Sequence, residues 1–266
     1  MKKYNFYFIT IFNLMFISSC ISEYGKQISE NTKGNDSISV SEENAENTVL
    51  NSVKCLKVED TTGILDRYKK ERSEIENIRA GFSEKDSLND SLISDAGNFL
   101  YKSLLNKIIP YWYGTEWDFN GYTDIPNKGQ IACGYFVSTT LKHLGFNLNR
   151  FKMAQLYSLK MIESICGKEN VRSYSAAKFD EMMNYLKSRN DDVYLLGLSC
   201  HTGFLSLEND TVYFIHSSYV APLCVIKEYA DRSDVLKYSS VFVIGSLFGD
   251  KEIVKKWITG KEFVAN

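Results

Sequence analysis

The chain has 266 residues, of which 44% are hydrophobic and 24% are charged, and its formal net charge is −2. This composition is ordinary for a globular protein with a sizeable core. So small a net charge supplies no basic surface for nucleic acid, and we expect no nucleic-acid partner.

The first twenty residues read MKKYNFYFITIFNLMFISSC, with two lysines, a short apolar run and a small-residue stretch that ends in cysteine. The run is too short to span a membrane and is typical of a secretory signal. Its last four residues resemble the lipobox of bacterial lipoproteins. This resemblance implies that residues 1–19 are a signal peptide and that Cys20 is the lipidation site; a plain signal peptide is the alternative. We expect an exported protein, lipid-anchored to a bacterial membrane in the periplasm or at the outer membrane.

Three segments follow the signal. Residues 20–55 are rich in Ser, Glu, Asn and Lys and poor in large apolar residues, so they cannot offset the entropy cost of ordering and are interpreted as a flexible tether. Residues 56–93 have helical apolar spacing and are interpreted as an N-terminal helical extension. Residues 94–266 are expected to form the functional domain.

Helices are predicted in the first part of this region. A long one is expected over residues 84–109, with Ser83 as its N-terminal cap and Pro110 after its end. Three further helices are predicted over residues 132–144, 153–166 and 176–188.

The loop over residues 110–129 is rich in aromatic residues: Tyr111, Trp112, Tyr113, Trp117, Phe119 and Tyr122. Aromatic side chains in such a loop either fill the core or line a cleft. We expect most of them to fill the core and assign Trp112 and Trp117 to the substrate-binding side.

From Asp192 onward the sequence predicts strands, which together with the preceding helices indicates an α+β domain with a mainly antiparallel sheet. A two-residue turn at Asn209 and Asp210 would pair Glu208 with Thr211. In that register the two histidines of the hairpin, at positions 201 and 216, project from the same face as diagonal neighbours.

These histidines and one cysteine predict a nucleophilic site. Cys133 stands at the start of a predicted helix, where the helix dipole and a nearby imidazole would lower the pKa of its thiol. The amides of Cys133 and Gly134 would donate to an oxyanion. His201 would act as the base, and His216 would hold His201 in position.

Less specific interpretations compete with this one. A cysteine in a helix is most often a small buried apolar side chain. A zinc site made by Cys133, His201 and His216 is conceivable, but no C-x-x-C or H-x-x-x-H spacing supports it, and we predict neither a metal nor a cofactor. His143, beside Lys142 on the same helix, is expected to be exposed to solvent. The four cysteines that remain after Cys20 and Cys133, at positions 55, 166, 200 and 224, allow three disulfide pairings, which the sequence does not distinguish.

Five blocks occur in the order found in one family: PYWYGT from Pro110, ACGYFV from Ala132, DDVYLL from Asp191, HTGFL from His201 and IHSSY from Ile215. They resemble the NlpC-type cell-wall cysteine peptidases, whose fold is a compact papain-like domain. The resemblance covers roughly residues 94–247. It implies that Cys133 is the nucleophile, His201 the base and His216 the orienting residue, and that Tyr111 faces the thiol and assists substrate binding.

The chain departs from the family pattern around the nucleophile. Ala132 replaces an aspartate, Gly134 and Tyr135 replace Ser-Gly, and the preceding loop is about ten residues longer than usual. The resemblance therefore implies amide hydrolysis, with peptidoglycan stem peptides as the expected substrate, more firmly than it implies the family's usual cleavage site. Two alternatives stay open: a protease or acyltransferase acting on another amide or thioester, and a non-catalytic envelope lipoprotein that binds a wall peptide or a protein.

Overall fold

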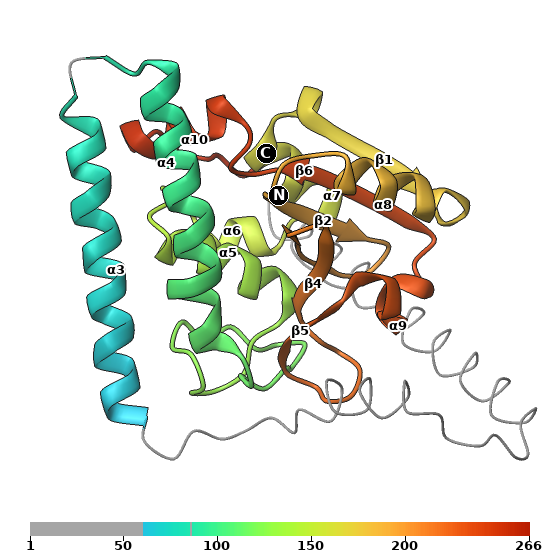
Figure 1. Cartoon of the computed structure of the whole chain (residues 1–266). Helices are drawn as coiled ribbons and strands as arrows, with labels where there is room; N and C mark the ends of the chain where they lie inside the picture. Colours follow the sequence, from blue (N-terminus) through green and yellow to red (C-terminus); the bar gives the residue numbers. More distant parts are fainter. Residues whose placement is uncertain (1–60, 86) are drawn as a thin grey trace, which may run out of the picture. The chain divides into compact units, whose positions relative to one another are not determined.

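The computed structural model describes residues 61–85 and 87–266 (Figure 1). Over these residues helices combine with an antiparallel sheet, so the α+β class predicted from the sequence is confirmed. The predicted signal peptide, Cys20 and the predicted tether lie outside the described residues, as do Cys55 and the first five residues of the predicted extension.

The sheet is built from six strands in the order β1-β6-β2-β3-β4-β5, and every neighbouring pair is antiparallel. The strands are β1 (Val171–Ser175), β2 (Val193–Leu198), β3 (Thr202–Glu208), β4 (Thr211–Ser217), β5 (Val225–Tyr229) and β6 (Val241–Ser246). The sequence predicted strands only from Asp192 onward, so β1 was missed. The stretch from Val193 to Leu207 forms two strands and turns back on itself between β2 and β3, where the Leu198 amide donates to the His201 carbonyl over 2.8 Å.

The β3–β4 hairpin has the predicted register. Glu208 pairs with Thr211, and each pair farther along the hairpin keeps the same offset. Asn209 and Asp210 have φ values of 48° and 64°, the left-handed conformation that a two-residue turn needs to match the twist of its strands. Asn and Asp adopt this conformation more readily than most residues, so local sequence is sufficient to set the register.

The helices are α3 (Thr61–Ser83), α4 (Asp90–Ser103), α5 (Cys133–His143), α6 (Arg150–Ala154), α7 (Ser158–Cys166), α8 (Phe179–Lys187), α9 (Asp234–Lys237) and α10 (Lys251–Thr259). After α4 the chain continues through a π turn, η1 (Leu104–Ile108), and a 3-10 turn, η2 (Ile109–Trp112). Single 3-10 turns also occur at η3 (Lys168–Asn170), η4 (Ala176–Lys178) and η5 (Ala230–Arg232).

The predicted cap of the second helix was wrong. Ser83 is the last residue of α3, and its hydroxyl donates to the Ala80 carbonyl over 2.7 Å. The cap of α4 is Asn89, whose side chain accepts from the Leu92 amide over 2.9 Å. Both residue types are good caps, and the sequence pattern alone did not show that α3 extends as far as Ser83.

The helix predicted over residues 153–166 ends at Cys166 as expected, but its predicted start was wrong, because a separate short helix ends at Ala154 and α7 begins at Ser158. Asn149 caps the short helix α6 by accepting from the Phe151 and Lys152 amides. The chain then leaves the helical conformation before α7. Helix α10, close to the end of the chain, was not predicted.

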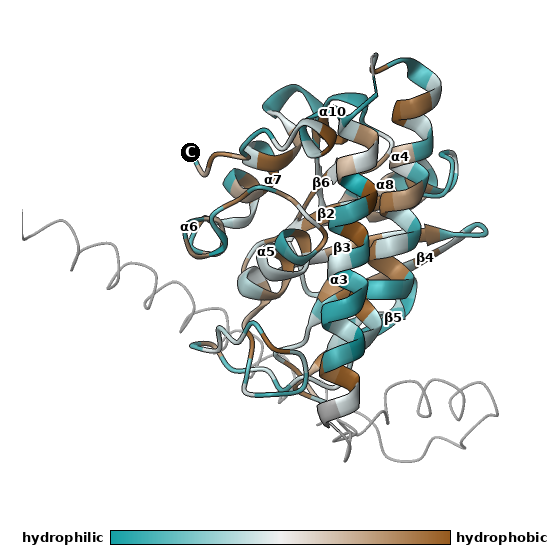
Figure 2. Cartoon of the chain, turned by 90° about the vertical axis from the view of Figure 1, so that its left-hand side faces the viewer, coloured by the Kyte–Doolittle hydropathy of each residue, from teal (hydrophilic) through white to brown (hydrophobic). Residues whose placement is uncertain are grey.

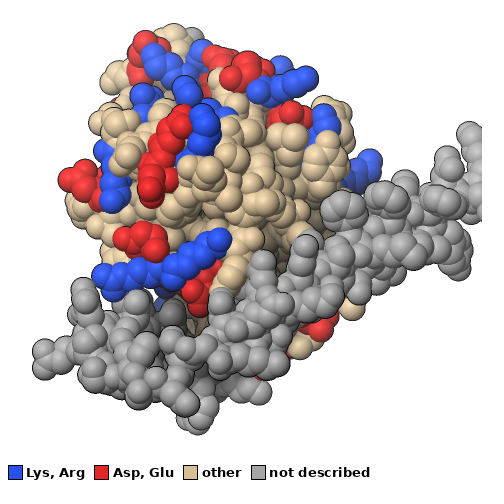
Figure 3. Space-filling view, turned by 90° about the vertical axis from the view of Figure 1, so that its right-hand side faces the viewer, with Lys and Arg blue, Asp and Glu red and all other residues tan. Residues whose placement is uncertain are grey.

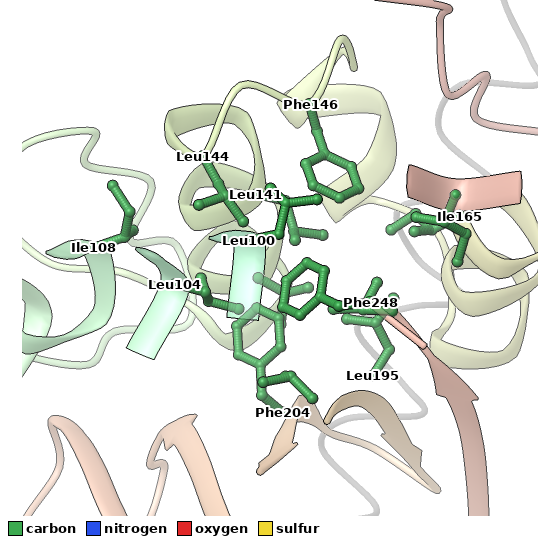
Figure 4. Close-up of a cluster of buried hydrophobic side chains, with 14 of the residues drawn as sticks. Leu100, Leu104, Ile108, Leu141, Leu144, Phe146, Ile165, Leu195, Phe204 and Phe248 are labelled. Carbon is green, nitrogen blue, oxygen red and sulfur yellow. The ribbon is translucent and has the colours of Figure 1, made fainter. Parts of the chain in front are cut away.

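The two faces of the sheet are covered by different helices, and alternate residues of each strand belong to different clusters. Leu195 and Phe204 pack in the larger cluster, with α4, α5, α7 and α10, and Figure 4 shows Leu195 beside Phe248 within this cluster. Leu196 packs in the smaller cluster, with α8 and α9. Figure 1 accordingly shows α3 and α4 on one side of the sheet and α8 and α9 on the other.

Helix α3 packs against this body through few side chains. Tyr68 and Ile75 are buried in the larger cluster, while the rest of the helix shows mainly polar colours in Figure 2. On the face displayed in Figure 3, basic and acidic side chains are interspersed around a broad uncharged area.

Candidate active site

Cys133 is the first residue of α5, as the sequence predicted. The segment that leads to it is fixed to the sheet and to the preceding loop. The Ser217 hydroxyl donates to the Ile131 carbonyl over 2.7 Å, and the Ala132 amide donates to the Gly121 carbonyl over 2.8 Å. These bonds hold the start of α5 at the end of β4.

The aromatic loop is fixed to α5 by a buried arginine. Arg150 donates to the Tyr122 carbonyl over 2.9 Å and to the Thr139 hydroxyl over 3.0 Å. It is only 8% exposed, and its guanidinium lies 4.4 Å from the centre of the Phe151 ring. Since one guanidinium bonds both loop and helix, the position of the loop relative to Cys133 is well defined.

The environment of the Cys133 thiol differs from our expectation. Backbone hydrogen bonds from Thr202, Gly134 and Cys133 itself favour the thiolate, yet burial has the larger effect and raises the pKa of the thiol. The prediction of a lowered pKa was therefore wrong, because it considered the helix N-terminus and not the depth of the sulfur. The resting thiol is neutral.

Gly134 has a packing role as well as its expected donor role. A Cβ at this position would lie 2.7 Å from the Ala154 carbonyl oxygen, so only glycine lets α5 and α6 approach this closely. This contact gives a structural reason for a glycine directly after the cysteine. The amide of Gly134 remains directed at the sulfur.

The two hairpin histidines form a bonded pair on one face of the sheet, as predicted. His201 Nε2 lies 2.8 Å from His216 Nδ1, and both side chains are buried. Burial lowers the pKa of each ring, and the neighbouring His216 lowers the pKa of His201 further. A Cβ at Gly203 would lie 2.9 Å from His216 Cβ, so the glycine provides space for that ring.

Glu228 is a member of the site that sequence reasoning missed. Its Oε1 lies 3.1 Å from His216 Nε2 and accepts from the Ser233 hydroxyl over 2.6 Å. The carboxylate raises the pKa of His216 in opposition to burial, although burial has the larger effect. Glu228 lies in β5, and the sequence does not predict the register of this strand against β4. The structure pairs Glu228 with Phe214, diagonal to His216.

The thiol and the imidazoles approach the first residue of β3, Thr202, from different faces of the sheet. Helix α5 packs on the sheet face of Phe204, whereas His216 stacks on Phe214 of the other face, with ring centres 4.0 Å apart. The thiol meets the backbone of Thr202, the residue after His201. None of the hydrogen bonds found among the described residues joins the thiol to the His201 ring.

The two tryptophans assigned to the substrate side have different environments. Trp112 is completely buried, and its Nε1 donates to the Tyr68 hydroxyl over 2.8 Å, so it belongs to the core and the prediction that it binds substrate was wrong. Trp117 is partly exposed and packs on Tyr219, which in turn lies 5.0 Å from the His201 ring. Trp117 thus comes close to the site.

Tyr111 lies next to the N-terminal helix. Its ring is partly buried, 5.0 Å from the Tyr68 ring, and its carbonyl accepts from Asn127 Nδ2 over 2.7 Å. These contacts fix the start of the aromatic loop. The implied position opposite the thiol stays a prediction.

His143 is buried, so the prediction that it is exposed was wrong. Its Nδ1 lies 2.9 Å from the Tyr68 hydroxyl, and the ring is 6% exposed. Burial, together with the positive charges of Arg72, Arg150 and Lys142, lowers the pKa of His143 to about 3. Tyr68 of helix α3 covers this side of α5 and removes the His143 ring from solvent.

Four cysteines lie among the described residues. Cys200 and Cys224 are both disulfide-bonded, whereas Cys133 and Cys166 are free. Burial raises the pKa of the Cys166 thiol, and this residue packs in the larger core cluster. Of the four cysteines whose pairing the sequence left open, Cys166 therefore takes no part in a disulfide.

Within the described ranges, no group of three His, Cys, Asp or Glu residues is arranged to hold a metal ion. No helix in the same part of the chain is long and apolar enough to cross a membrane. No protein-family model matches the chain, and neither a curated protein nor a solved structure shows significant similarity to it.

Proposed function

We propose that the chain is a cysteine hydrolase of the papain-like NlpC type that cleaves amide bonds, with peptidoglycan stem peptides as its substrate. The observation that most supports this proposal is the 2.8 Å bond between His201 Nε2 and His216 Nδ1. This bond leaves the other nitrogen of His201 as the candidate base. The thiol of Cys133 accepts a hydrogen bond from the backbone of Thr202, the residue after His201.

The proposed reaction begins from a neutral thiol and a neutral imidazole. His201 accepts the proton of Cys133, and the sulfur attacks the carbonyl carbon of the amide. The amides of Cys133 and Gly134 stabilise the oxyanion that forms. The imidazolium then protonates the leaving amine as the C–N bond breaks, which gives a thioester. Water, deprotonated by His201, attacks the thioester and releases the acid and the thiol.

Because the thiol and the imidazoles approach β3 from different sides, this mechanism requires a movement that brings the sulfur within reach of His201 Nδ1. Catalytic hydrogen bonds are often long or poorly aligned in free enzymes and become shorter when substrate binds. Tyr219 packs on the His201 ring and Trp117 packs on Tyr219, so a substrate that packs on these two side chains would exclude bulk water from the space beside His201. Exclusion of water strengthens the attraction between the thiolate and the imidazolium.

The proposed location is the outer side of a bacterial membrane, with Cys20 as the lipid anchor. The sequence at the N-terminus supports this proposal, and so do the disulfide bonds of Cys200 and Cys224, because disulfides persist in oxidising compartments. A hydrolase anchored there has access to the cell wall.

The test is to incubate the purified chain with muropeptides and to follow new amines and carboxylates by mass spectrometry. We expect Cys133→Ala to lower turnover by at least about 100-fold, since the nucleophile is removed. Cys166→Ala is the matched control, because it removes the other free thiol of the described residues and should leave turnover intact. Equal turnover by wild type and Cys133→Ala would contradict the proposal.

A second candidate is a non-catalytic envelope lipoprotein that binds a wall peptide or a protein. It is favoured by the raised pKa of the Cys133 thiol and by the lack of a bond between this thiol and His201. An electrophilic thiol probe distinguishes the two. A hydrolase reacts at Cys133 in a manner that depends on His201, whereas a binding protein reacts slowly with or without that imidazole. The protease or acyltransferase alternative requires substrate profiling, because its thiol would also react.

A further inference from the structure

We propose that Glu228 is a positioning residue that fixes the protonation pattern of both site histidines, with Ser233 holding its carboxylate in place. The inference deepens the proposed function and rests on it. The geometry behind it is a continuous series of hydrogen bonds from His201, directly before β3, through His216 of β4 and Glu228 of β5 to Ser233 at the start of α9.

The pattern follows from counting protons along this chain. A carboxylate can only accept, so the proton of the 3.1 Å bond between His216 Nε2 and Glu228 Oε1 belongs to His216. A neutral imidazole has one proton, and His216 Nδ1 is therefore an acceptor. The proton of the 2.8 Å bond to His216 then belongs to His201 Nε2. His201 Nδ1 is left with a lone pair, as a base requires.

This series of hydrogen bonds also connects the base to a counter-charge, the Glu228 carboxylate, when His201 is protonated. Once His201 has accepted the thiol proton on Nδ1, its Nε2–H still donates to His216, and the positive charge faces Glu228 through one ring. Without the carboxylate, the His216 proton could occupy either nitrogen. With the proton on His216 Nδ1, His201 Nε2 would have to accept the bond between the two rings. The proton of His201 would then be on Nδ1, and this nitrogen could not accept the proton of the thiol.

The surrounding side chains leave this arrangement little freedom. The His216 ring stacks on Phe214, with 9° between the planes, and the ring is completely buried. Ser233 is buried as well, and its hydroxyl oxygen also accepts from the Leu236 amide as the cap of α9. The hydroxyl proton is thereby directed at Glu228.

The first measurement is the ring ¹⁵N spectrum of the full chain, which has only three histidines and is therefore assignable. We expect both His201 and His216 of the wild type to be protonated at Nε2 and not at Nδ1. Glu228→Leu should produce a mixture of the two forms at His216. Glu228→Gln retains an acceptor without the charge, so it should keep the wild-type pattern.

The second measurement is the rate of Cys133 alkylation by iodoacetamide near neutral pH. We expect Glu228→Leu and Glu228→Gln to lower this rate roughly tenfold or more, by analogy with the loss of a carboxylate that orients a metal-binding histidine. Glu208→Leu is the matched control: it removes another carboxylate of the same sheet, which pairs with Lys227 at 2.7 Å, and should change neither measurement.

Protonation of His201 at Nδ1 in the wild type, or an unchanged pattern in Glu228→Leu, overturns the inference. If Glu228→Leu does not fold, the inference is still tested by the wild-type ¹⁵N spectrum and by the alkylation rate of Glu228→Gln. Failure of the proposed function has a different signature. The spectra would then follow our expectation, while muropeptide turnover would be absent and alkylation would be the same with His201→Asn.

Discussion

The pair formed by His201 and His216 contrasts with the third histidine of the chain, His143. All three rings are buried, and burial lowers the pKa of each. The bonds of the pair lead to the carboxylate of Glu228, whereas His143 bonds to the neutral hydroxyl of Tyr68 and has three positive charges nearby. A nearby carboxylate favours the protonated form of a buried imidazole, so a positive charge on the pair would be stabilised whereas one on His143 would not.

The hydrogen bonds around His143 and those around His201 and His216 have different roles. Trp112 Nε1 donates to the Tyr68 oxygen, so the Tyr68 proton is free to donate to His143 Nδ1. The three side chains form a closed neutral network that joins α3, η2 and α5. We infer that this network stabilises the fold, while the chain from His201 to Glu228 positions a reactive group.

The contrast between His143 and the histidine pair can be tested by three changes. The largest expected effect is a loss of folding stability in acid, caused by the low pKa of His143. Its pKa is about 3 in the folded chain against an ordinary 6.5, so between these values the unfolded chain binds a proton that the folded chain does not. Stability is therefore fully present above pH 6.5 and falls as the pH decreases. From pH 6.5 to pH 3.5 the loss from this group is roughly 4 kcal/mol.

Urea unfolding at several pH values, with wild type and His143→Gln side by side, measures this loss. The variant should be less stable near neutral pH but should lose less stability in acid. Other groups titrate equally in both proteins, so the difference between the two curves isolates His143. Parallel curves would show that this ring is not held neutral by the fold.

A somewhat smaller effect is expected from Tyr68→Phe. The change leaves two buried groups, Trp112 Nε1–H and His143 Nδ1, without their partner, and the expected destabilisation is about 3 kcal/mol. Thermal or urea unfolding provides the measurement. Tyr157→Phe is the matched control, because Tyr157 is 62% exposed and the loss of its hydroxyl should have little effect. Similar costs for the two variants would contradict the network.

The smallest of the three effects is expected from Gly203→Ala, which acts on the pair formed by His201 and His216. The added Cβ would lie 2.7 Å from the Ile215 carbonyl oxygen and 2.9 Å from His216 Cβ, so we expect a loss of about 2 kcal/mol and slower alkylation of Cys133. Gly81→Ala in α3 is the control, since a Cβ there meets nothing within 4 Å and should stabilise the helix by up to about 1 kcal/mol. Normal alkylation of Gly203→Ala would show that the His216 ring has more space than the structure indicates.

Much of the site was predictable because it depends on local patterns. The turn at Asn209 and Asp210 and the alternation along both strands place His201 and His216 on one face, and the helix pattern places Cys133 at the start of α5. Turn conformation and strand pleat act over a few residues, so a sequence contains all the information that they need.

The other features depend on which segments meet in three dimensions. Glu228 joins the site through the pairing of β5 with β4, which the loop between these strands does not reveal. His143 and Trp112 are buried because α3, remote in sequence, covers them, and the Cys133 thiol is neutral because packing removes it from water. The sequence by itself determined where the hairpin turns and that both of its histidines share one face of the sheet. Only the tertiary structure decided their burial and charge, because the free energy of an ionisable group depends on everything packed around it.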